Sequence, residues 1–415
     1  MKVVVLGAGV IGVTSAWYLA RAGHQVTVLE RRSDVALETS FGNAGGVCPS
    51  FAGPWAAPGM PTKALKWMFQ SAPPLKIFPK FDHKQWLWLG SFIKNCNTKN
   101  FQENKVYMQR IAHYSKSCLQ EIRSILNLKY DAKSAGVLQI FQTESEVVSG
   151  ALSAQILSEL GVEHSIVDRA RAESIEPALA HSQTRIVGGL FLPGDEIGDC
   201  QLFCKEILEA LKNYDVDFQF NTEVTGFSRS GGRIDHVITT KGHRSGDAFV
   251  VALGPFVSNL LNKLDINIPV YPVKGYSITG ELIDPERGPI SSVMDEHSKV
   301  MITRLGNRLR AAGVAELAGF DRTLRKSSIL GITRATERLF PNAVNYKNLS
   351  VWCGFRPMTP DGPPKLGKTK YSNLFLNVGH GSNGWTQACG SSKIVADILS
   401  RKKPDIDISG LTYTH

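Results

Sequence analysis

Three glycines near the start of the chain, Gly7, Gly9 and Gly12, have the spacing of a loop that binds phosphate groups. An apolar run precedes them and a helical pattern follows, which is the context that this spacing requires. Gly7 permits a tight turn, Gly9 removes a side chain where a pyrophosphate must approach, and Gly12 lets a helix pack closely on a strand. The free N–H groups of that helix would then face the phosphates.

Glu30 ends the second apolar run, where a carboxylate can accept hydrogen bonds from ribose hydroxyls. These features predict a dinucleotide site but do not separate NAD from FAD. A second loop of small and polar residues, 39–47, follows at once, and such a loop suits a long flavin cofactor. The alternatives are a glycine-rich turn without a ligand and a plain loop.

A third glycine-rich stretch, 379–384, lies between a strand-like run and a helical pattern near the end of the chain. The start of that helix can point its N–H groups at a bound group, or it can simply cap a helix that packs on a sheet.

The elements that must position these residues alternate in α/β fashion at the start, middle and end of the chain. Strand-rich and helical insertions separate them, so we expect one nucleotide-binding domain built from discontinuous segments and a second domain built from the insertions. Helical patterns cover 13–22, 101–127, 144–160, 200–213 and 321–340, and strand patterns cover 136–141, 218–227, 249–254, 268–280, 291–315 and 373–378.

The 415 residues have an ordinary globular composition and contain no apolar run long enough for a transmembrane helix. No secretory signal is visible and the cysteines form no CxxC pair, so we expect a cytoplasmic protein without a metal site. The net charge of +10 comes from scattered lysines, and no nucleic-acid-binding motif accompanies it. Tryptophans and lysines gather in 55–94, a composition that suits either a membrane-surface contact or packing over an active site.

Six blocks resemble one known family in their order along the chain, from residue 3 to about 395. They are GAGVIG, ETSFGNAGGV, VVALGPFVS, YPVKGYSIT, GFRPMTPDGPPKLG and NVGHGSNGWTQACGS, and together they resemble the FAD-dependent D-amino acid dehydrogenases. These belong to a wider superfamily with glycine oxidase, sarcosine oxidase and D-amino acid oxidase. The last two blocks are the ones more specific to the dehydrogenases.

The resemblance implies a Rossmann-like, glutathione-reductase-like FAD-binding domain formed by 1–50, 193–260 and 350–415. It also implies an inserted α+β substrate domain on an antiparallel sheet, formed by 51–192 and 261–349. The residues predicted to contact non-covalently bound FAD are Gly7, Ala8, Gly9, Val10, Ile11, Gly12, Glu30, Arg31, Arg32, Thr39, Ser40, Asn43, Ala44, Gly45, Gly46, Val47, Val224, Ala252, Leu253, Gly254, Gly381, Ser382, Asn383, Gly384, Trp385 and Thr386.

The same resemblance assigns Arg356 to the substrate carboxylate, which a guanidinium fork binds with two hydrogen bonds. Tyr276 and Tyr271 are candidates for the active-site wall, and Lys274 is a weaker one. His380 is either a flavin neighbour or a loop histidine. Glycine oxidase has an arginine at the position of Ser382, so this chain would lack one cation there.

The implied reaction is oxidation of a D-amino acid by hydride transfer from Cα to flavin N5, followed by hydrolysis to a 2-oxo acid and ammonia. A quinone or another non-oxygen acceptor would take the electrons, and contact through 55–94 would place the protein on the inner face of the cytoplasmic membrane. The alternatives are an O2-dependent oxidase of glycine, sarcosine or a cyclic imino acid, covalent flavin attachment through Cys353, and a flavoprotein without turnover.

Overall fold

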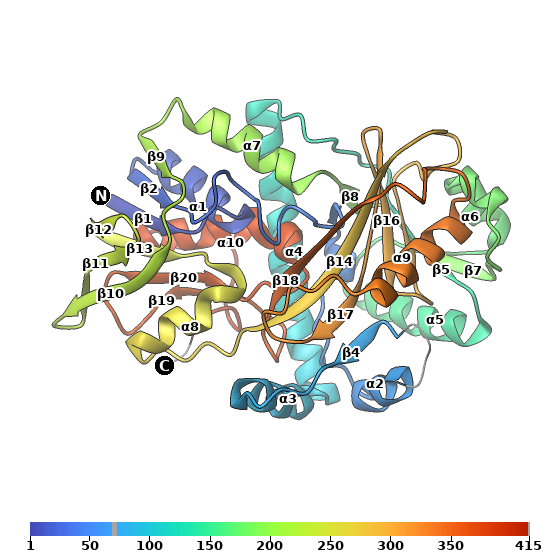
Figure 1. Cartoon of the computed structure of the whole chain (residues 1–415), viewed down its shortest axis with the longest axis horizontal. Coiled ribbons are helices and arrows are strands. Elements are labelled where there is room, and N and C mark those ends of the chain that lie inside the picture. Colours follow the sequence, from blue (N-terminus) through green and yellow to red (C-terminus); the bar gives the residue numbers. More distant parts are fainter. Residues whose placement is uncertain (69–72, 414–415) are drawn as a thin grey trace.

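The computed structural model describes residues 1–68 and 73–413. Two large sheets dominate it, and Figure 1 shows them side by side along the long axis of the molecule. The N-terminal strand and the last helix belong to the same end of the molecule, although almost the whole chain separates them in sequence. Two smaller sheets complete the strands described here.

The first large sheet has six strands in the order β19-β20-β13-β1-β2-β9. Its strands are parallel except for β19, which runs antiparallel to β20. The continuous apolar run of β1 is explained by its central place, because both of its faces are covered. The strands are β1 (Lys2–Leu6), β2 (Gln25–Leu29), β9 (Val216–Gln219), β13 (Ala248–Val251), β19 (Lys365–Lys368) and β20 (Leu374–Val378).

Alternate residues of these strands join two different cores. Val3 and Val5 pack with the helices α1, α4, α7 and α10, whereas Val4 and Leu6 pack with α8 and with the three-stranded sheet β10-β11-β12. The covering elements are α1 (Val10–Arg21), α4 (Thr98–Leu126), α7 (Cys200–Leu211), α8 (Val257–Leu261), α10 (Gly384–Leu399), β10 (Val224–Ser230), β11 (Arg233–Thr239) and β12 (Gly242–Ser245).

The second large sheet has nine strands, in the order β18-β14-β17-β16-β15-β5-β7-β6, with β4 paired to β17. Most of its pairs are antiparallel, and β15 with β5 and β17 with β4 are parallel. Its elements are β4 (Leu75–Ile77), β5 (Val137–Phe141), β6 (Ser165–Val167), β7 (Gly188–Leu192), β14 (Tyr271–Glu281), β15 (Ser292–Asp295), β16 (Val300–Leu305), β17 (Arg308–Leu317) and β18 (Ser350–Met358), with α5 (Glu144–Glu159), α6 (Arg169–Ile175) and α9 (Lys326–Leu339) packed nearby.

Two helices from the segment 55–94, α2 (Met60–Met68) and α3 (His83–Asn95), lie with β4 along the lower edge of Figure 1. The two-stranded sheet pairs β3 (Gly46–Val47) with β8 (Glu196–Ile197). Short 3₁₀ helices cover Pro49–Phe51, Pro177–His181, Gly254–Phe256 and Asn262–Leu264.

The mixed α/β fold predicted from the sequence is confirmed, but the single strand expected over 218–227 is wrong. β9 ends in the parallel sheet and β10 begins in the three-stranded sheet, because Asn221 has a left-handed backbone (φ 52°) that turns the chain between them. The division into two domains stays a prediction. Within it, β18 of the segment 350–415 lies in the nine-stranded sheet, and α4 of the segment 51–192 packs on α10.

Candidate active site

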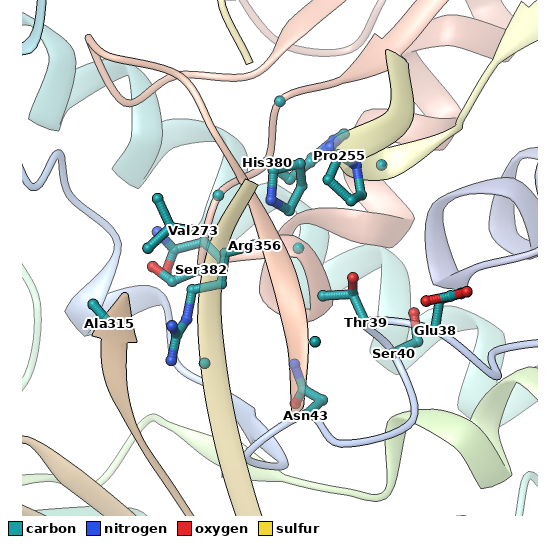
Figure 2. Close-up of a pocket in the computed structure, with 18 of the residues that line it drawn as sticks. Glu38, Thr39, Ser40, Asn43, Pro255, Val273, Ala315, Arg356, His380 and Ser382 are labelled. Atoms are coloured by element: carbon teal, nitrogen blue, oxygen red, sulfur yellow. The ribbon is translucent and has the colours of Figure 1, made fainter. Parts of the chain in front are cut away.

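A continuous cavity of about 1130 Å³ lies between the two large sheets. The glycine turn after β1, the loop 38–48 and the start of α10 line one part of it, and β14, β17 and β18 line another. Figure 2 shows Glu38, Thr39 and Ser40 on one side of the cavity and Arg356 on the other. The geometry therefore places the predicted cofactor loops and the predicted substrate arginine around one space.

The glycine turn needs its glycines for different reasons. Gly7 has a φ of 102°, and a Cβ on Gly12 would lie 1.8 Å from the carbonyl oxygen of Gly7. A Cβ on Gly9 would meet only the hydroxyl of Ser40, at 3.5 Å, so this glycine leaves space at the cavity instead of satisfying a packing constraint. The space beside Gly9 suits a group that must come close to the backbone.

The first turn of α1 is open toward that space. The N–H of Val10 donates to the Ser40 hydroxyl at 3.1 Å, while the N–H groups of Ile11 and Gly12 have no acceptor among the described residues. Val10 and Ile11 line the cavity. Free N–H groups at a helix start, with the positive end of the helix dipole, form a site for a phosphate anion.

Glu30 is fixed beside the glycine turn. One of its oxygens accepts from the N–H of Ala8 and the other from the N–H of Arg32, each at 2.8 Å. Each carboxylate oxygen has a second lone pair, so Glu30 can still accept hydrogen bonds from ribose hydroxyls. This geometry agrees with the role predicted from its position at the end of the second strand.

Glu38 is a cavity residue that the sequence prediction missed. It pairs with Arg31 and Arg322 at 2.6 Å each and with Arg32 at 2.5 Å. Burial opposes ionisation of Glu38, but hydrogen bonds from Arg322 and Arg32 outweigh it and lower the pKa of the carboxyl. In the sequence, only its position directly before Thr39 indicated that Glu38 could belong to the predicted cofactor loop.

The loop 39–47 is held between the two large sheets. The Thr39 hydroxyl donates to the carbonyl of Phe355 at 2.7 Å, and the carbonyl of Asn43 accepts from Arg310 at 3.2 Å. Gly45 has a φ of 88°, and its carbonyl accepts from the N–H of Gly198 at 2.8 Å. The loop therefore contacts the strand that carries Arg356 through its hydrogen bond to Phe355.

The third glycine-rich stretch brings the start of α10 to the cavity. Asn383, the residue before α10, makes no side-chain cap, and the N–H groups of Gly384, Trp385 and Thr386 have no acceptor among the described residues. These four residues line the cavity. A helix start in this state stabilises negative charge, as does the start of α1.

Arg356 lies half-buried in the cavity and has no carboxylate partner within residues 1–68 and 73–413. Its Nη1 donates to the carbonyl of Val314 at 3.0 Å, and its Cζ lies 5.7 Å from the ring centroid of Trp55. Burial lowers the pKa of Arg356 to about 10, so the side chain stays charged at neutral pH. An unpaired cation beside apolar side chains favours an anionic ligand.

The remaining predicted catalytic residues already have partners. The hydroxyl of Tyr276 donates to Glu316 at 3.0 Å, and Lys274 forms a fully buried ion pair with Glu316 at 2.9 Å. The hydroxyl of Tyr271 accepts from the N–H of Gly319 at 2.9 Å, and Tyr271 is not among the residues that line the cavity. Because each hydroxyl is already hydrogen-bonded within the protein, it would have to exchange its partner in order to bind substrate. A substrate-binding role for either tyrosine therefore stays a prediction.

His380 lines the cavity and is almost fully buried. Its Nε2 lies 3.0 Å from the Ser391 hydroxyl, and burial lowers the pKa of His380 to about 3. The imidazole is therefore neutral at physiological pH. Cys353, the alternative point of covalent attachment, is buried, lies outside the cavity lining, and its Sγ lies 3.4 Å from the carbonyl of Arg322.

Most of the predicted cofactor residues line the cavity, and a few lie just behind the lining. The two groups were not separable in the sequence because both belong to the same loops. The predicted residues behind the lining are Ala8, Gly12, Arg32, Gly45 and Val47, and lining residues that were not predicted include Glu38, Trp55, Gly275, Ala315 and Trp352.

The donor set fits FAD. The start of α1, with its free N–H groups, and the carboxylate of Glu30 would hold its phosphates and ribose, and the loop 39–47 and the start of α10 would lie along the rest of the molecule. Bound FAD would supply a two-electron oxidant to the cavity that Arg356 also lines.

Comparisons with known proteins identify the family to which the chain belongs. A family model described as FAD dependent oxidoreductase matches residues 2–398. A D-amino acid dehydrogenase of Agrobacterium fabrum is 46% identical over 414 residues, which cover 100% of this chain and 99% of the relative. One of Rhizorhabdus wittichii is 47% identical over 411 residues and 99% of both chains.

Solved structures share the fold at lower identity. Glycine oxidase from Bacillus cereus has a TM-score of 0.76 at 20% identity, over 100% of this chain and 99% of the other. L-Proline dehydrogenase from P. horikoshii has a TM-score of 0.75 at 19% identity, over 99% and 96% of the two chains. With a family model that spans nearly its whole length, the chain belongs to the family of FAD-dependent oxidoreductases.

Proposed function

We propose that the chain is an FAD-dependent D-amino acid dehydrogenase, which converts D-amino acids to 2-oxo acids and ammonia. The observation that carries the proposal is the unpaired Arg356 in the cavity that the FAD loops also line. The names of the relatives at 46% and 47% identity support the choice of substrate and of a dehydrogenase.

The main task of the protein's own residues is to hold the substrate in the orientation that the reaction requires. Arg356 would bind the substrate carboxylate and so orient Cα, and bound FAD would supply the two-electron oxidant that accepts the Cα hydrogen as hydride. The free N–H groups at the start of α10 stabilise negative charge that develops beside them. The substrate amine must lose its proton before it reacts, because its lone pair helps to expel the hydride, and His380, whose pKa burial lowers to about 3, accepts a proton poorly.

The proposed substrate domain, 51–192 and 261–349, contains every strand of the nine-stranded sheet except β18, together with the helices packed near that sheet. Its strands β14 and β17 bring Val273 and Ala315 to the cavity near Arg356, as Figure 2 shows. Apolar walls exclude water from this part of the site, which strengthens the attraction between a carboxylate and the arginine.

The proposed electron acceptor is a quinone or another non-oxygen acceptor, reached at a peripheral membrane contact on the inner face of the cytoplasmic membrane. Leu65, Trp86, Leu87 and Ile93 on α2 and α3 are 57%, 53%, 69% and 57% exposed, and Leu65 and Ile93 also line the cavity. Exposed lysines flank them on the same helices, a combination that suits an anionic lipid surface. The flanking lysines are Lys63, Lys66, Lys84 and Lys94.

This contact would be peripheral. Among the described helices none combines the length and the apolar character needed to cross a bilayer. Trp88 is buried and Trp55 packs against the same cluster while partly exposed, which supports the packing alternative for these two tryptophans, whereas Trp86 is exposed.

The first test is anaerobic incubation of the purified, FAD-loaded chain with a panel of amino acids in both chiralities. D-Amino acids are expected to bleach the flavin absorbance and to reduce an artificial acceptor, while L-enantiomers do neither. The same reactions in air are then assayed for hydrogen peroxide. Peroxide formed in step with substrate loss would identify an oxidase, and an unchanged flavin spectrum with every compound would identify a flavoprotein without this activity.

The acceptor and the membrane contact need separate assays. A soluble quinone should restore turnover, and the chain should co-sediment with anionic vesicles but not with neutral ones. The double variant Trp86→Ala, Leu87→Ala should lose sedimentation and keep turnover with the artificial acceptor. Sedimentation equal to that of the parent would remove α3 from the proposed contact.

A further inference from the structure

Arg356 lies flat on the backbone of a neighbouring strand. β18 and β14 pair so that Gly354 is opposite Gly275 and Arg356 is opposite Val273. A Cβ placed on Gly275 would lie 2.5 Å from Nη1 of Arg356 and 2.6 Å from both Cζ and Nη2. The backbone of Gly275 is outside the left-handed region, so its conformation does not require glycine. Position 275 needs a residue without a side chain because the guanidinium of Arg356 occupies the space that a Cβ would fill.

The strand on the other side of Gly275 is irregular. Between Lys274 and Tyr276 the register of β14 with β17 shifts, so that Val314 and Ala315 lie opposite the single residue Gly275. Val314 has a φ of 60°, a conformation that β-branched residues rarely adopt. Such bulges redirect backbone groups, and strained residues gather at functional sites.

The irregular strand supplies the anchor of the guanidinium. The carbonyl of Val314 accepts a hydrogen bond from Nη1 of Arg356 at 3.0 Å, and that of Lys274 lies 3.5 Å from the same atom. Both contacts involve Nη1, and among the described residues Nη2 and Nε donate to no protein acceptor. Two donors on one edge of a guanidinium match the two oxygens of a carboxylate.

We propose that Gly275 is a positioning residue for Arg356: with the carbonyl of Val314 it forms an arginine seat that fixes which edge of the guanidinium faces the substrate carboxylate. The inference rests on the proposed function for the identity of the ligand. It assigns Gly275 and Val314 the role of holding Arg356 in place.

The test is a double-variant cycle with propionate, a carboxylate that cannot be oxidised in this reaction. Its affinity is measured in the FAD-loaded protein by titration of the flavin spectrum. Gly275→Ala should weaken propionate binding roughly 5- to 150-fold, because overpacking displaces the fork. With Arg356→Lys as the background, which has no planar fork to displace, the same change should alter affinity by about twofold or less.

Gly354 provides the matched control, since it lies directly opposite Gly275 in the same strand pair. A Cβ on Gly354 would come 2.0 Å from the indole of Trp352, and its three nearest atoms all belong to that ring instead of to Arg356. Gly354→Ala should therefore have the same effect on propionate affinity in the parent and in the Arg356→Lys background. Equal effects of Gly275→Ala in both backgrounds, or parent affinity in Gly275→Ala, would overturn the inference.

A folding defect would be informative as well. If Gly275→Ala loses FAD, the double variant Gly275→Ala, Arg356→Lys should regain it, and failure of this rescue would also overturn the inference. Turnover of D-alanine by the parent tests the proposed function separately. A parent that binds propionate in a Gly275-dependent manner but oxidises no amino acid would refute the function and leave the arginine seat in place.

Discussion

The two sides of the cavity bind in different ways. On the cofactor side, backbone N–H groups at the starts of α1 and α10 face the cavity, and their places follow from local turns at Gly9 and Gly381. On the arginine side, the charged side chain of Arg356 lines the cavity, and its place depends on carbonyls of neighbouring strands far away in sequence. A backbone site tolerates changes of side chain but no added bulk, whereas a side-chain site depends on one group and its supports.

The largest effect is expected on the cofactor side, from Gly12→Ala. The new Cβ would lie 1.8 Å from the Gly7 carbonyl oxygen, so α1 must move away from the turn. The Kd for FAD should rise by about tenfold or more, and the Tm of the cofactor-free protein should fall. Gly9→Ala is the control: its Cβ has space in the protein, so it should weaken FAD binding and leave the Tm of the cofactor-free protein unchanged.

Arg356→Ala should distinguish the two sides of the cavity most clearly, because it should lower activity toward the substrate without lowering flavin content. Loss of a hydrogen bond to a charged group costs about 1.5–3 kcal/mol, so kcat/KM for a D-amino acid should fall about 10- to 150-fold. Flavin content should stay at the parent level, because no cofactor loop depends on the guanidinium. Arg356→Lys should recover part of the loss. Parent-like kcat/KM in the alanine variant would show that the arginine is structural.

Glu30→Gln should have a smaller effect, limited to the cofactor. The amide oxygen can still accept one of the two backbone hydrogen bonds, but its NH2 group faces the other N–H. The Kd for FAD should rise about 2- to 10-fold, and kcat at saturating FAD should not change. A change in the KM for the amino acid at saturating FAD would contradict the separation of the two sides.

The smallest effect is expected from the buried contact between Ser50, which follows the cofactor loop, and Asp195, which follows β7 of the nine-stranded sheet. One oxygen of Asp195 accepts from the hydroxyl and the N–H of Ser50, at 3.0 and 3.3 Å, and the other has no partner among the described residues. Burial raises the pKa of Asp195 from 3.8 to about 7, although the hydrogen bonds from Ser50 oppose the shift. The folded state therefore loses stability as the pH rises from 3.8 to about 7, because the unfolded carboxyl ionises freely in that range.

Asp195→Asn keeps the oxygen that Ser50 needs and cannot ionise. The Tm of the variant minus that of the parent should be a few degrees more positive at pH 8 than at pH 4, with kcat/KM unaffected. Glu176, whose pKa burial also raises to about 7, is common to both proteins and cancels in the comparison. The same Tm difference at both pH values would show that Asp195 does not titrate in this range.

The cofactor side was largely predictable from sequence because its signals are local. The spacing of Gly7, Gly9 and Gly12 places a helix start at a turn, and Glu30 comes at the end of the next strand. Strand limits were harder: apolar alternation continued through 218–227, but the chain changes its hydrogen-bond partners at Asn221. Alternation of apolar and polar residues indicates which face of a strand is buried, but it does not indicate which other strand pairs with it.

The arginine side was placed by resemblance, and its supports could not be predicted from local patterns. Gly275 faces Arg356 only through the register of β14 with β18, and the bulge at Val314 exists only where β17 meets β14. Tyr276 shows the same limit, since Glu316, which occupies its hydroxyl, lies on a different strand. Spacing along one strand cannot reveal a partner that the sheet brings to it.

The six-stranded sheet also has a consequence for synthesis on the ribosome. β1 is its centre and is made first, but β13, β20 and α10 are made after residue 247, and the last two come from the final part of the chain. At about 5–20 residues per second, roughly 20 to 80 seconds separate the first strand from the last. The glycine turn is therefore finished long before the helix start of α10 that lines the same side of the cavity, and full cofactor binding must wait until nearly the whole chain has been translated.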